Sequence, residues 1–192
     1  MMKICMIITA AGISSRQKEN KLLIRSCNET MIEKTINTFL NKDLSIFVVV
    51  GHQKELMLPI ITNRFRNDII IVDNNNYKSG IASSIKAGIL KAGENYDYYG
   101  FCNGDKPFIN AKTINRLINY LEGEKPKILI PLYQKKGGHP TFFSKDFIKD
   151  FSLISGDTGG KEVIKKYPSD VVYLPVEDEG VVLDMDKYLN NE

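Results

Sequence analysis

The chain has 192 residues, a net charge of +3 and 43% hydrophobic residues, which is ordinary for a globular protein. It exceeds the roughly 150 residues of one domain by too little to require a second, so we expect a single domain over residues 1–192. The mild charge, with acidic residues spread throughout, argues against a nucleic-acid partner. The three cysteines lie far apart and form no Cys-x-x-Cys or Cys/His cluster, which argues against a disulfide framework and a zinc site.

The first predicted element is a buried strand over residues 4–8, a short apolar run bounded by small residues. The run is too short to span a membrane and lacks a secretory cleavage pattern. We therefore expect a cytoplasmic protein without a membrane partner.

Helices and strands are predicted to alternate along the chain up to about residue 132. Helical spacing or capping residues indicate helices over residues 31–40 (capped by Asn28 or Thr30), 53–65 (kinked or split by Pro59), 79–93 and 111–121. Short β-branched or apolar runs indicate strands over 46–50, 68–72, 97–102 and 127–132. The remainder is more broken: it holds a Gly-Gly-His-Pro turn, an apolar stretch at 141–143, a short helix, a helix ending at 167, and apolar runs at 171–174 and 181–183.

This alternation predicts an α/β fold, a Rossmann-like three-layer α/β/α sandwich with a mostly parallel sheet. Ligands of such sheets bind beyond the carboxyl ends of the strands. Loops at Gly12, Asn74 and Asp105 follow the first, third and fourth predicted strands, so we expect them at one edge.

The loop after the first strand has the composition of a phosphate-binding loop. Ala10, Ala11 and Gly12 carry almost no side chain, and Ser14, Arg16 and Lys21 add a hydroxyl and cations behind them. Exposed backbone N–H groups with fixed positive charge hold phosphates. The loop lacks the second glycine of a P-loop and two of the three glycines of the dinucleotide fingerprint. The alternative is a basic surface loop.

Carboxylates near strand ends suggest a metal site. Asp105 closes an apolar strand, where it is either a turn residue or a magnesium ligand, because magnesium favours one or two carboxylates with phosphate oxygens. Asp184 and Asp186 follow the last apolar run and form a second pair near an expected strand end.

The motifs together resemble one family of nucleotidyltransferases, the CTP:molybdopterin (molybdenum cofactor) cytidylyltransferases and their relatives similar to molybdopterin-guanine-dinucleotide synthase. Residues 9–21 resemble the family's Leu-Ala-Ala-Gly-x-Ser-x-Arg-Met-Gly-x-x-Lys signature, with Gln17-Lys18 in place of Met-Gly. Residues 75–88 resemble its Asn-Pro-x-Trp segment, and residues 104–107 resemble its Gly-Asp-x-Pro motif. Residues 138–140 resemble its Gly-His-Pro motif, residues 156–161 its Gly-Asp-x-Gly-Ala-Arg motif, and residues 184–186 its closing Asp-Ile-Asp motif. The matches run from residue 9 to residue 186.

The resemblance implies a nucleotide-diphospho-sugar-transferase-like fold and a role for each matching residue. It implies a nucleotide-binding half over about 1–107 and an acceptor-binding half over about 108–192. Catalytic roles would fall to Arg16, Lys21 and Asp105. The nucleotide would be bound by Ala10, Ala11, Gly12, Ser14, Arg16, Lys21, Gly80 and Ser84; the acceptor by His139, Asp157 and Lys161; and Mg²⁺ by Asp105 and Asp186.

The activity implied is transfer of CMP from CTP to a phosphorylated acceptor, most simply molybdopterin, with release of pyrophosphate. A molybdoenzyme or its chaperone would be a further partner. The same chemistry with another nucleotide or acceptor, such as GTP or a sugar or polyol phosphate, is the nearest alternative. The alternative from another functional class is a nucleotide-binding accessory protein without turnover. The sequence leaves this alternative open because it departs from the family motifs at Gln17-Lys18, at Lys161 in place of Arg, and after Asp186.

Overall fold

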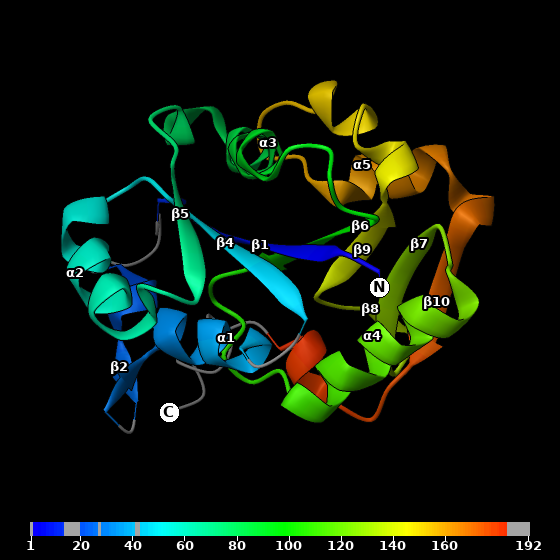
Figure 1. The fold of residues 1–192 in the computed structure, drawn as a ribbon, viewed down its shortest axis with the longest axis horizontal. Coiled ribbons are helices and arrows are strands. Elements are labelled where there is room, and N and C mark those ends of the chain that lie inside the picture. Colours follow the sequence, from blue (N-terminus) through cyan, green and yellow to red (C-terminus); the bar gives the residue numbers. More distant parts are fainter. Residues whose placement is uncertain (1, 14–19, 27, 41–42, 184–192) are drawn as a thin grey trace.

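The computed structural model describes residues 2–13, 20–26, 28–40 and 43–183. A mixed β-sheet lies between two layers of helices (Figure 1), which confirms the predicted α/β sandwich. Within the described residues, no helix combines the length and the apolar character needed to span a membrane.

The sheet has the strand order β10-β7-β9-β6-β1-β4-β5, with β8 paired to β7. All neighbouring strands on this path are parallel except β9, which runs antiparallel between β6 and β7. The strands are β1 (Ile4–Ala10), β4 (Leu44–Val50), β5 (Ile69–Asp73), β6 (Tyr98–Asn103), β7 (Ile128–Tyr133), β8 (Lys136–Gly137), β9 (Thr141–Ser144) and β10 (Val171–Pro175); a small separate ribbon pairs β2 (Arg25–Ser26) with β3 (Glu29–Thr30).

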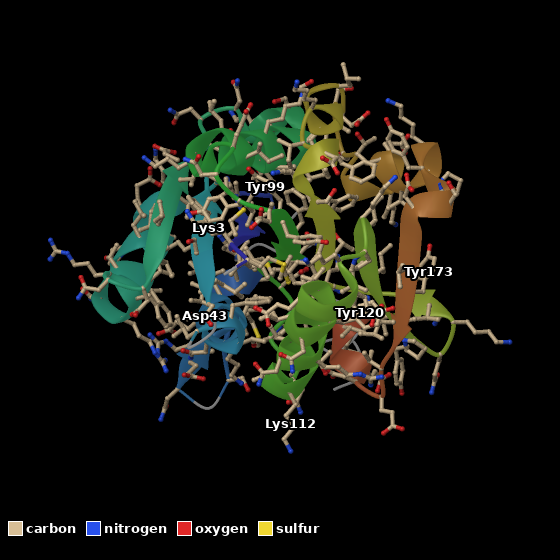
Figure 2. The ribbon with its side chains drawn as sticks, turned by 45° about the vertical axis from the view of Figure 1, so that its right-hand side comes forward. Lys3, Asp43, Tyr99, Lys112, Tyr120 and Tyr173 are labelled. Atoms are coloured by element: carbon tan, nitrogen blue, oxygen red, sulfur yellow. The ribbon has the colours of Figure 1, made fainter. Side chains whose placement is uncertain are left out.

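Helices cover both faces of this sheet and enclose two separate apolar cores. On one face α1 (Met31–Phe39), α2 (Lys54–Phe65) and α4 (Ala111–Glu124) pack on alternate residues of β1, Met6 and Ile8 among them. On the other face α3 (Ile81–Ala92) and α5 (Gly160–Lys166) pack on the intervening residues, such as Ile7. Figure 2 shows Tyr99 on the α3 side of the sheet and Tyr120 on α4, opposite it. Because side chains alternate across a strand, a strand buried on both faces is apolar throughout, as β1 is.

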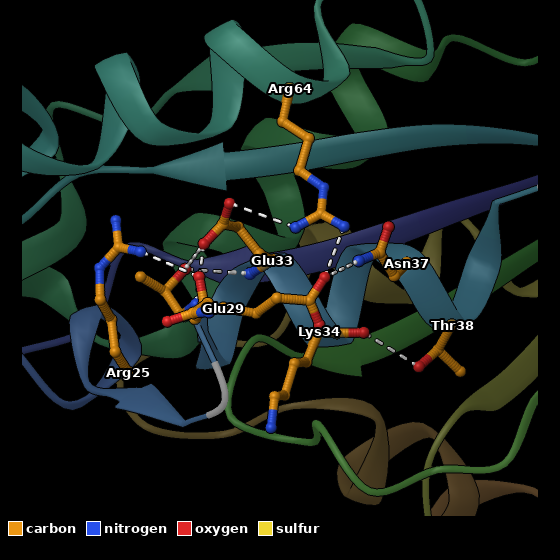
Figure 3. Close-up of polar contacts among 9 residues, drawn as sticks. Arg25, Glu29, Glu33, Lys34, Asn37, Thr38 and Arg64 are labelled. Carbon is orange, nitrogen blue, oxygen red and sulfur yellow. Dashed lines mark hydrogen bonds and ion pairs between the residues drawn. The ribbon is translucent and has the colours of Figure 1, made fainter.

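The start of α1 shows why this segment is helical. Thr30 and Glu33 form a reciprocal capping box: the Thr30 Oγ1 accepts from the Glu33 N–H at 3.3 Å, and the Glu33 carboxylate accepts from the Thr30 N–H at 2.7 Å. Arg64 of α2 reaches across to Glu33 and Glu29 (Figure 3). Burial by itself raises the pKa of Glu33, but the Thr30 hydrogen bonds and the Arg64 charge outweigh it and lower the pKa below its ordinary value. This network joins two helices of one layer.

Two local expectations need correction, and one open alternative is decided. Pro59 does not split its helix, because α2 continues from Lys54 to Phe65 with Pro59 on an exposed face. The apolar run at 181–183 is not a strand: residues Glu179–Val181 form a 3-10 helix, η6, whose Val181 packs into the α1/α4 core. Of the two proposed caps for α1, Thr30 is the one used.

Between β7 and β10 the chain forms short helical turns in addition to β8, β9 and α5. These are the 3-10 helices η3 (Lys145–Phe147), η4 (Asp150–Ser152) and η5 (Pro168–Asp170), with η1 (Lys21–Leu23) and η2 (Tyr77–Ser79) earlier in the chain. η1 and η2 begin at the carboxyl edge of the parallel strands and so carry side chains into the site described next.

Candidate active site

The loops after β1, β5 and β6 meet at one edge of the sheet and line a cleft of about 410 Å³. These strands and β4 are mutually parallel, so their carboxyl ends lie together, as expected from the sequence. The lining includes five of the predicted nucleotide-site residues and the predicted metal ligand: Ala10, Gly12, Lys21, Gly80, Ser84 and Asp105.

The Lys21 ammonium and the Asp105 carboxylate form an ion pair in this cleft. The Lys21 Nζ lies 2.7 Å from the Asp105 Oδ2, and the two side chains are only 21% and 13% exposed. Lys21 opens η1, which the Asn20 side chain caps by accepting from the Leu22 N–H at 3.1 Å. The helix start therefore holds the Lys21 side chain against Asp105, which follows β6 and lies 84 positions further along the chain.

The second carboxylate oxygen of Asp105 is an unsatisfied acceptor in the part of the chain that the structure describes. Oδ1 is buried and has no hydrogen-bond partner among the residues that the structure describes. Buried polar atoms are nearly always satisfied, so this oxygen fits a bound cation or donor. In the described ranges no three His, Cys, Asp or Glu side chains lie close enough together to hold a metal ion by themselves. A divalent cation on Asp105 would therefore draw on phosphate and water oxygens, as magnesium commonly does.

Asn74 organises the first turn of α3 next to the cleft. Its buried side-chain amide donates to the Ser83 Oγ at 2.9 Å and to the Ser84 Oγ at 3.0 Å, while its Oδ1 accepts from the Asn76 N–H at 3.0 Å. The Ser84 hydroxyl thus has one lone pair occupied and keeps its proton for another acceptor. A loop that composition alone marks as a turn is here a rigid support for Ser84.

The start of α3 is capped by a distant loop rather than by a neighbouring side chain. Gly80 has no side-chain capping bond, and the Gly156 carbonyl accepts from the Ala82 N–H at 3.1 Å. Gly80 has φ +94°, and a Cβ there would lie 2.3 Å from the Gly156 carbonyl carbon and oxygen. Only glycine permits this approach, which brings Asp157 to the cleft wall.

A second, larger pocket of about 740 Å³ adjoins the cleft. The two share Thr9, Ile81, Asn103 and Asp157 in their linings. All three predicted acceptor-site residues line this pocket: His139, Asp157 and Lys161. We call the 410 Å³ space the nucleotide cleft and the 740 Å³ space the acceptor pocket, after the ligands that the sequence predicts for their lining residues.

His139 is held in the wall of the acceptor pocket with an altered protonation equilibrium. Its backbone N–H donates to the Val181 carbonyl at 2.8 Å, and its Nδ1 lies 3.4 Å from the Phe101 carbonyl oxygen. Burial, and secondarily the charge of Lys106, lowers its pKa to about 4. The imidazole is therefore neutral near pH 7, and it offers the pocket a hydrogen bond rather than a charge.

Comparison with known proteins identifies the family of this chain. Residues 6–171 match the MobA-like NTP transferase domain. The chain belongs to this family. It is a nucleotidyltransferase domain, and the resemblance stated from its motifs is confirmed.

Three relatives illustrate the likeness. The molybdenum cofactor cytidylyltransferase of Escherichia coli is 23% identical over 180 residues, covering 94% of this chain and 89% of that protein. The crystal structure of Rv0371c from Mycobacterium tuberculosis has a TM-score of 0.81 at 20% identity, covering 99% and 97% of the two chains, and a further structure of that protein is a manganese complex (TM-score 0.73, 19% identity, 91% and 89% covered). The 4-diphosphocytidyl-2C-methyl-D-erythritol synthase of Anaerococcus prevotii has a TM-score of 0.73 at 18% identity, covering 99% and 95%.

Not every predicted residue of this NTP transferase domain lies in the cleft. Ala11 is fully buried, its carbonyl accepts from the His52 N–H at 3.2 Å, and it is not part of the cleft lining. Ser14, Arg16 and Asp186 lie outside the described residues.

Sequence reasoning missed two residues that line both pockets, Thr9 and Asn103, and it missed the burial of Lys106 beside Asp105. Thr9 and Asn103 form the shared wall and are joined by a hydrogen bond of 3.2 Å between Oγ1 and Oδ1. Lys106 is buried, and its Nζ donates to the Leu183 carbonyl at 2.8 Å, just before the predicted closing carboxylates. Asn103 could have been found from its place beside the Gly-Asp motif; Lys106 looked like a turn residue because nothing local shows what covers it.

Proposed function

We propose that this nucleotidyltransferase transfers CMP from CTP to the phosphate of molybdopterin and releases pyrophosphate. The observation that carries the proposal is the shared wall: the cleft with Lys21 and Asp105 opens directly beside a second pocket large enough for the acceptor. The name of the E. coli relative supports CTP and the molybdenum cofactor as the substrates.

In this proposal residues 1–107 bind the nucleotide, and residues 108–192 contribute most of the side chains that recognise the acceptor. Every lining residue of the nucleotide cleft except Asp157 falls between residues 9 and 105. The acceptor pocket draws on both parts, since Thr9, Ile85 and Phe101 contribute to it together with His139 and later residues.

The roles of the cleft residues follow from their chemistry. Gly12 and Ala10 let the triphosphate approach the backbone, and the Ser84 hydroxyl contacts the base or sugar beside Gly80. Lys21 neutralises phosphate charge. Ser14 and Arg16 follow in the same loop and would add further donors to the phosphates. An anionic acceptor phosphate needs little general base, so the main barrier is charge repulsion at the α-phosphorus.

Asp105 is the proposed ligand of a magnesium ion, with Asp186 as a second carboxylate. Bound Mg²⁺ would supply charge neutralisation at the α-phosphate in the transition state. The orphaned Asp105 Oδ1 supports this role. The Lys21 ammonium on Oδ2 fixes the carboxylate so that Oδ1 stays directed to the ligand.

Pyrophosphate release tests the proposal. We would measure it with CTP, GTP, ATP and UTP in turn, with Mg²⁺ and molybdopterin, for wild type and Asp105→Asn. CTP-dependent release that falls at least about a hundredfold in Asp105→Asn is expected, since loss of one transition-state electrostatic contact costs about that much. Asp68→Asn, at an exposed aspartate outside both pockets, is the matched control and should leave release unchanged.

The other outcomes separate the alternatives. Release with a different nucleotide would keep the chemistry and overturn the base assignment. Release only with a polyol phosphate would favour the second candidate, an acceptor of the kind named for the Anaerococcus prevotii synthase, whose fold this chain shares. Binding of CTP without release from any acceptor would indicate an accessory protein instead.

A further inference from the structure

The turn between β7 and β8 adopts a conformation that its residues disfavour. Tyr133 pairs with Lys136, so the turn consists of two residues, Gln134 and Lys135, with φ of 44° and 67°. Two-residue hairpins with positive φ at both positions strongly prefer Asn-Gly or Asp-Gly. Glutamine and lysine are strained there, and such strain collects at functional sites.

Lys135 lies in the wall of the acceptor pocket and is not part of the lining of the nucleotide cleft, which holds the Lys21–Asp105 pair. It lines that pocket together with Tyr173 of the edge strand β10, labelled in Figure 2. In the strand order, β7 is two positions from β6, the strand that Asp105 follows. At about 4.8 Å per strand, roughly 10 Å separate the carboxyl end of β6 from the turn after β7.

The lining between these two ends is largely apolar. Side chains from α3, β7 and α5 form it: Ile81, Ile85, Ile130, Leu132 and Ile164. Asp157 belongs to the wall shared with the nucleotide cleft, whereas Lys135 and Lys161, the second residue of α5, line the acceptor pocket alone. A bound molecule would therefore meet apolar side chains and, away from the shared wall, the ammonium groups of these two lysines.

We propose that Lys135 is a specificity-determining residue for the acceptor. It binds an anionic group of the acceptor other than the reacting phosphate. The acceptor therefore carries a second negative group that reaches the turn between β7 and β8. This inference rests on the proposed function for the identity of the pocket, but not for the affinity of Lys135 for an anion.

The chain offers a matched pair of variants for the test. Lys125 is also an exposed lysine with positive φ (49°), at the C-cap of α4, and it lines neither pocket. Lys135→Gly and Lys125→Gly therefore remove the same charge and relieve the same strain. Only the first removes a cation from the acceptor pocket. Lys135→Arg keeps the cation and serves as the rescue.

Two readouts are needed, one of them independent of turnover. The first is the Kd of 1-anilinonaphthalene-8-sulfonate, a fluorescent probe with an apolar body and one anionic group, for the CTP-saturated protein. The second is the split between KM for the molybdopterin acceptor, KM for CTP and kcat. We expect Lys135→Gly to raise the probe Kd and the acceptor KM about fivefold, as loss of one partly screened ion pair would. KM for CTP and kcat should stay within about twofold in the same variant.

The controls make the result decisive. Lys125→Gly and Lys135→Arg should both resemble wild type in the probe Kd and acceptor KM. Both glycine variants should raise the midpoint of thermal unfolding by about 2–4 °C, which shows that folding is intact. A probe Kd in Lys135→Gly equal to that of wild type, or no binding of the probe to wild type, would overturn the inference. Absence of turnover in wild type would count against the proposed function alone, and the probe Kd would then decide the role of Lys135.

Discussion

Asp105 has two oxygen atoms in different environments, and this difference defines its part in the site. One oxygen is paired with the Lys21 ammonium at 2.7 Å, and the other is buried without a partner among the described residues. A carboxylate held on one side and unsatisfied on the other is suited to bind a cation that arrives with the nucleotide. The effect expected for Asp105→Asn follows from that geometry.

His139 allows a prediction about pH at the scale of one residue. Its pKa is about 4 in the folded chain, below the ordinary 6.5, chiefly because of burial. As pH falls from 6.5 towards 4, the unfolded chain takes up a proton that the folded chain does not. The free energy of unfolding therefore decreases over that window by up to about 1.4 kcal/mol per pH unit. Above pH 6.5 the imidazole is neutral in both states, and the folded chain keeps its full stability.

The measurement is the free energy of unfolding of wild type and His139→Gln from pH 7 to pH 4. We expect the wild type to lose stability more steeply than the variant, because glutamine does not titrate. Parallel curves would show that His139 is protonated in the folded chain as readily as in the unfolded one.

At the scale of elements, the contact between Gly80 and the Gly156–Asp157 loop couples α3 to the segment before α5. The Gly156 carbonyl completes the first turn of α3, and the same approach carries Asp157 to the wall shared by both pockets. A side chain at position 80 would separate these segments.

Gly80→Ala should therefore affect both substrates. We expect a loss of stability of about 1–3 kcal/mol from positive-φ strain and overlap, and a higher KM for nucleotide and acceptor alike. Gly93→Ala is the matched control: Gly93 also has positive φ (+72°), but a Cβ there meets nothing within 4 Å. Gly93→Ala should lower the stability through the same positive-φ strain, but it should leave KM for both substrates unchanged. Equal effects of the two variants on KM would contradict the proposed coupling.

At the scale of the whole molecule, one continuous sheet joins the two proposed halves. The strands of residues 1–107 end at β6, and β9, β7 and β10 of the later part continue the same sheet from it. A ligand bound to one half is therefore linked to the stability of the other.

We expect CTP with Mg²⁺ to raise the midpoint of a single thermal transition, measured by differential scanning calorimetry. A concentration 100 times Kd corresponds to about 2.7 kcal/mol of added stability. Asp105→Asn should shift less, because the cation site contributes to nucleotide binding. Two separate transitions, only one of which moved with CTP, would contradict the continuous core.

Local chemistry in the sequence was sufficient for much of this structure. Apolar runs and helical spacing predicted β1, β4, β5, β6 and β7 and the helices between them, because period and β-branching act within a few residues. Motif order also predicted that the loops at Gly12 and Asp105 would lie in one cleft, since parallel strands must place their carboxyl ends at the same edge.

Other features were decided only by tertiary packing. No local pattern showed that β9 enters the sheet antiparallel between β6 and β7, that Gly156 caps α3, or that Lys106 is buried against Leu183. Lys135 likewise resembles any surface lysine until the hairpin places it on the acceptor pocket. The physical reason is that these features depend on contacts between segments far apart in the chain, whose partners are chosen by packing and backbone hydrogen bonding once the sheet has formed.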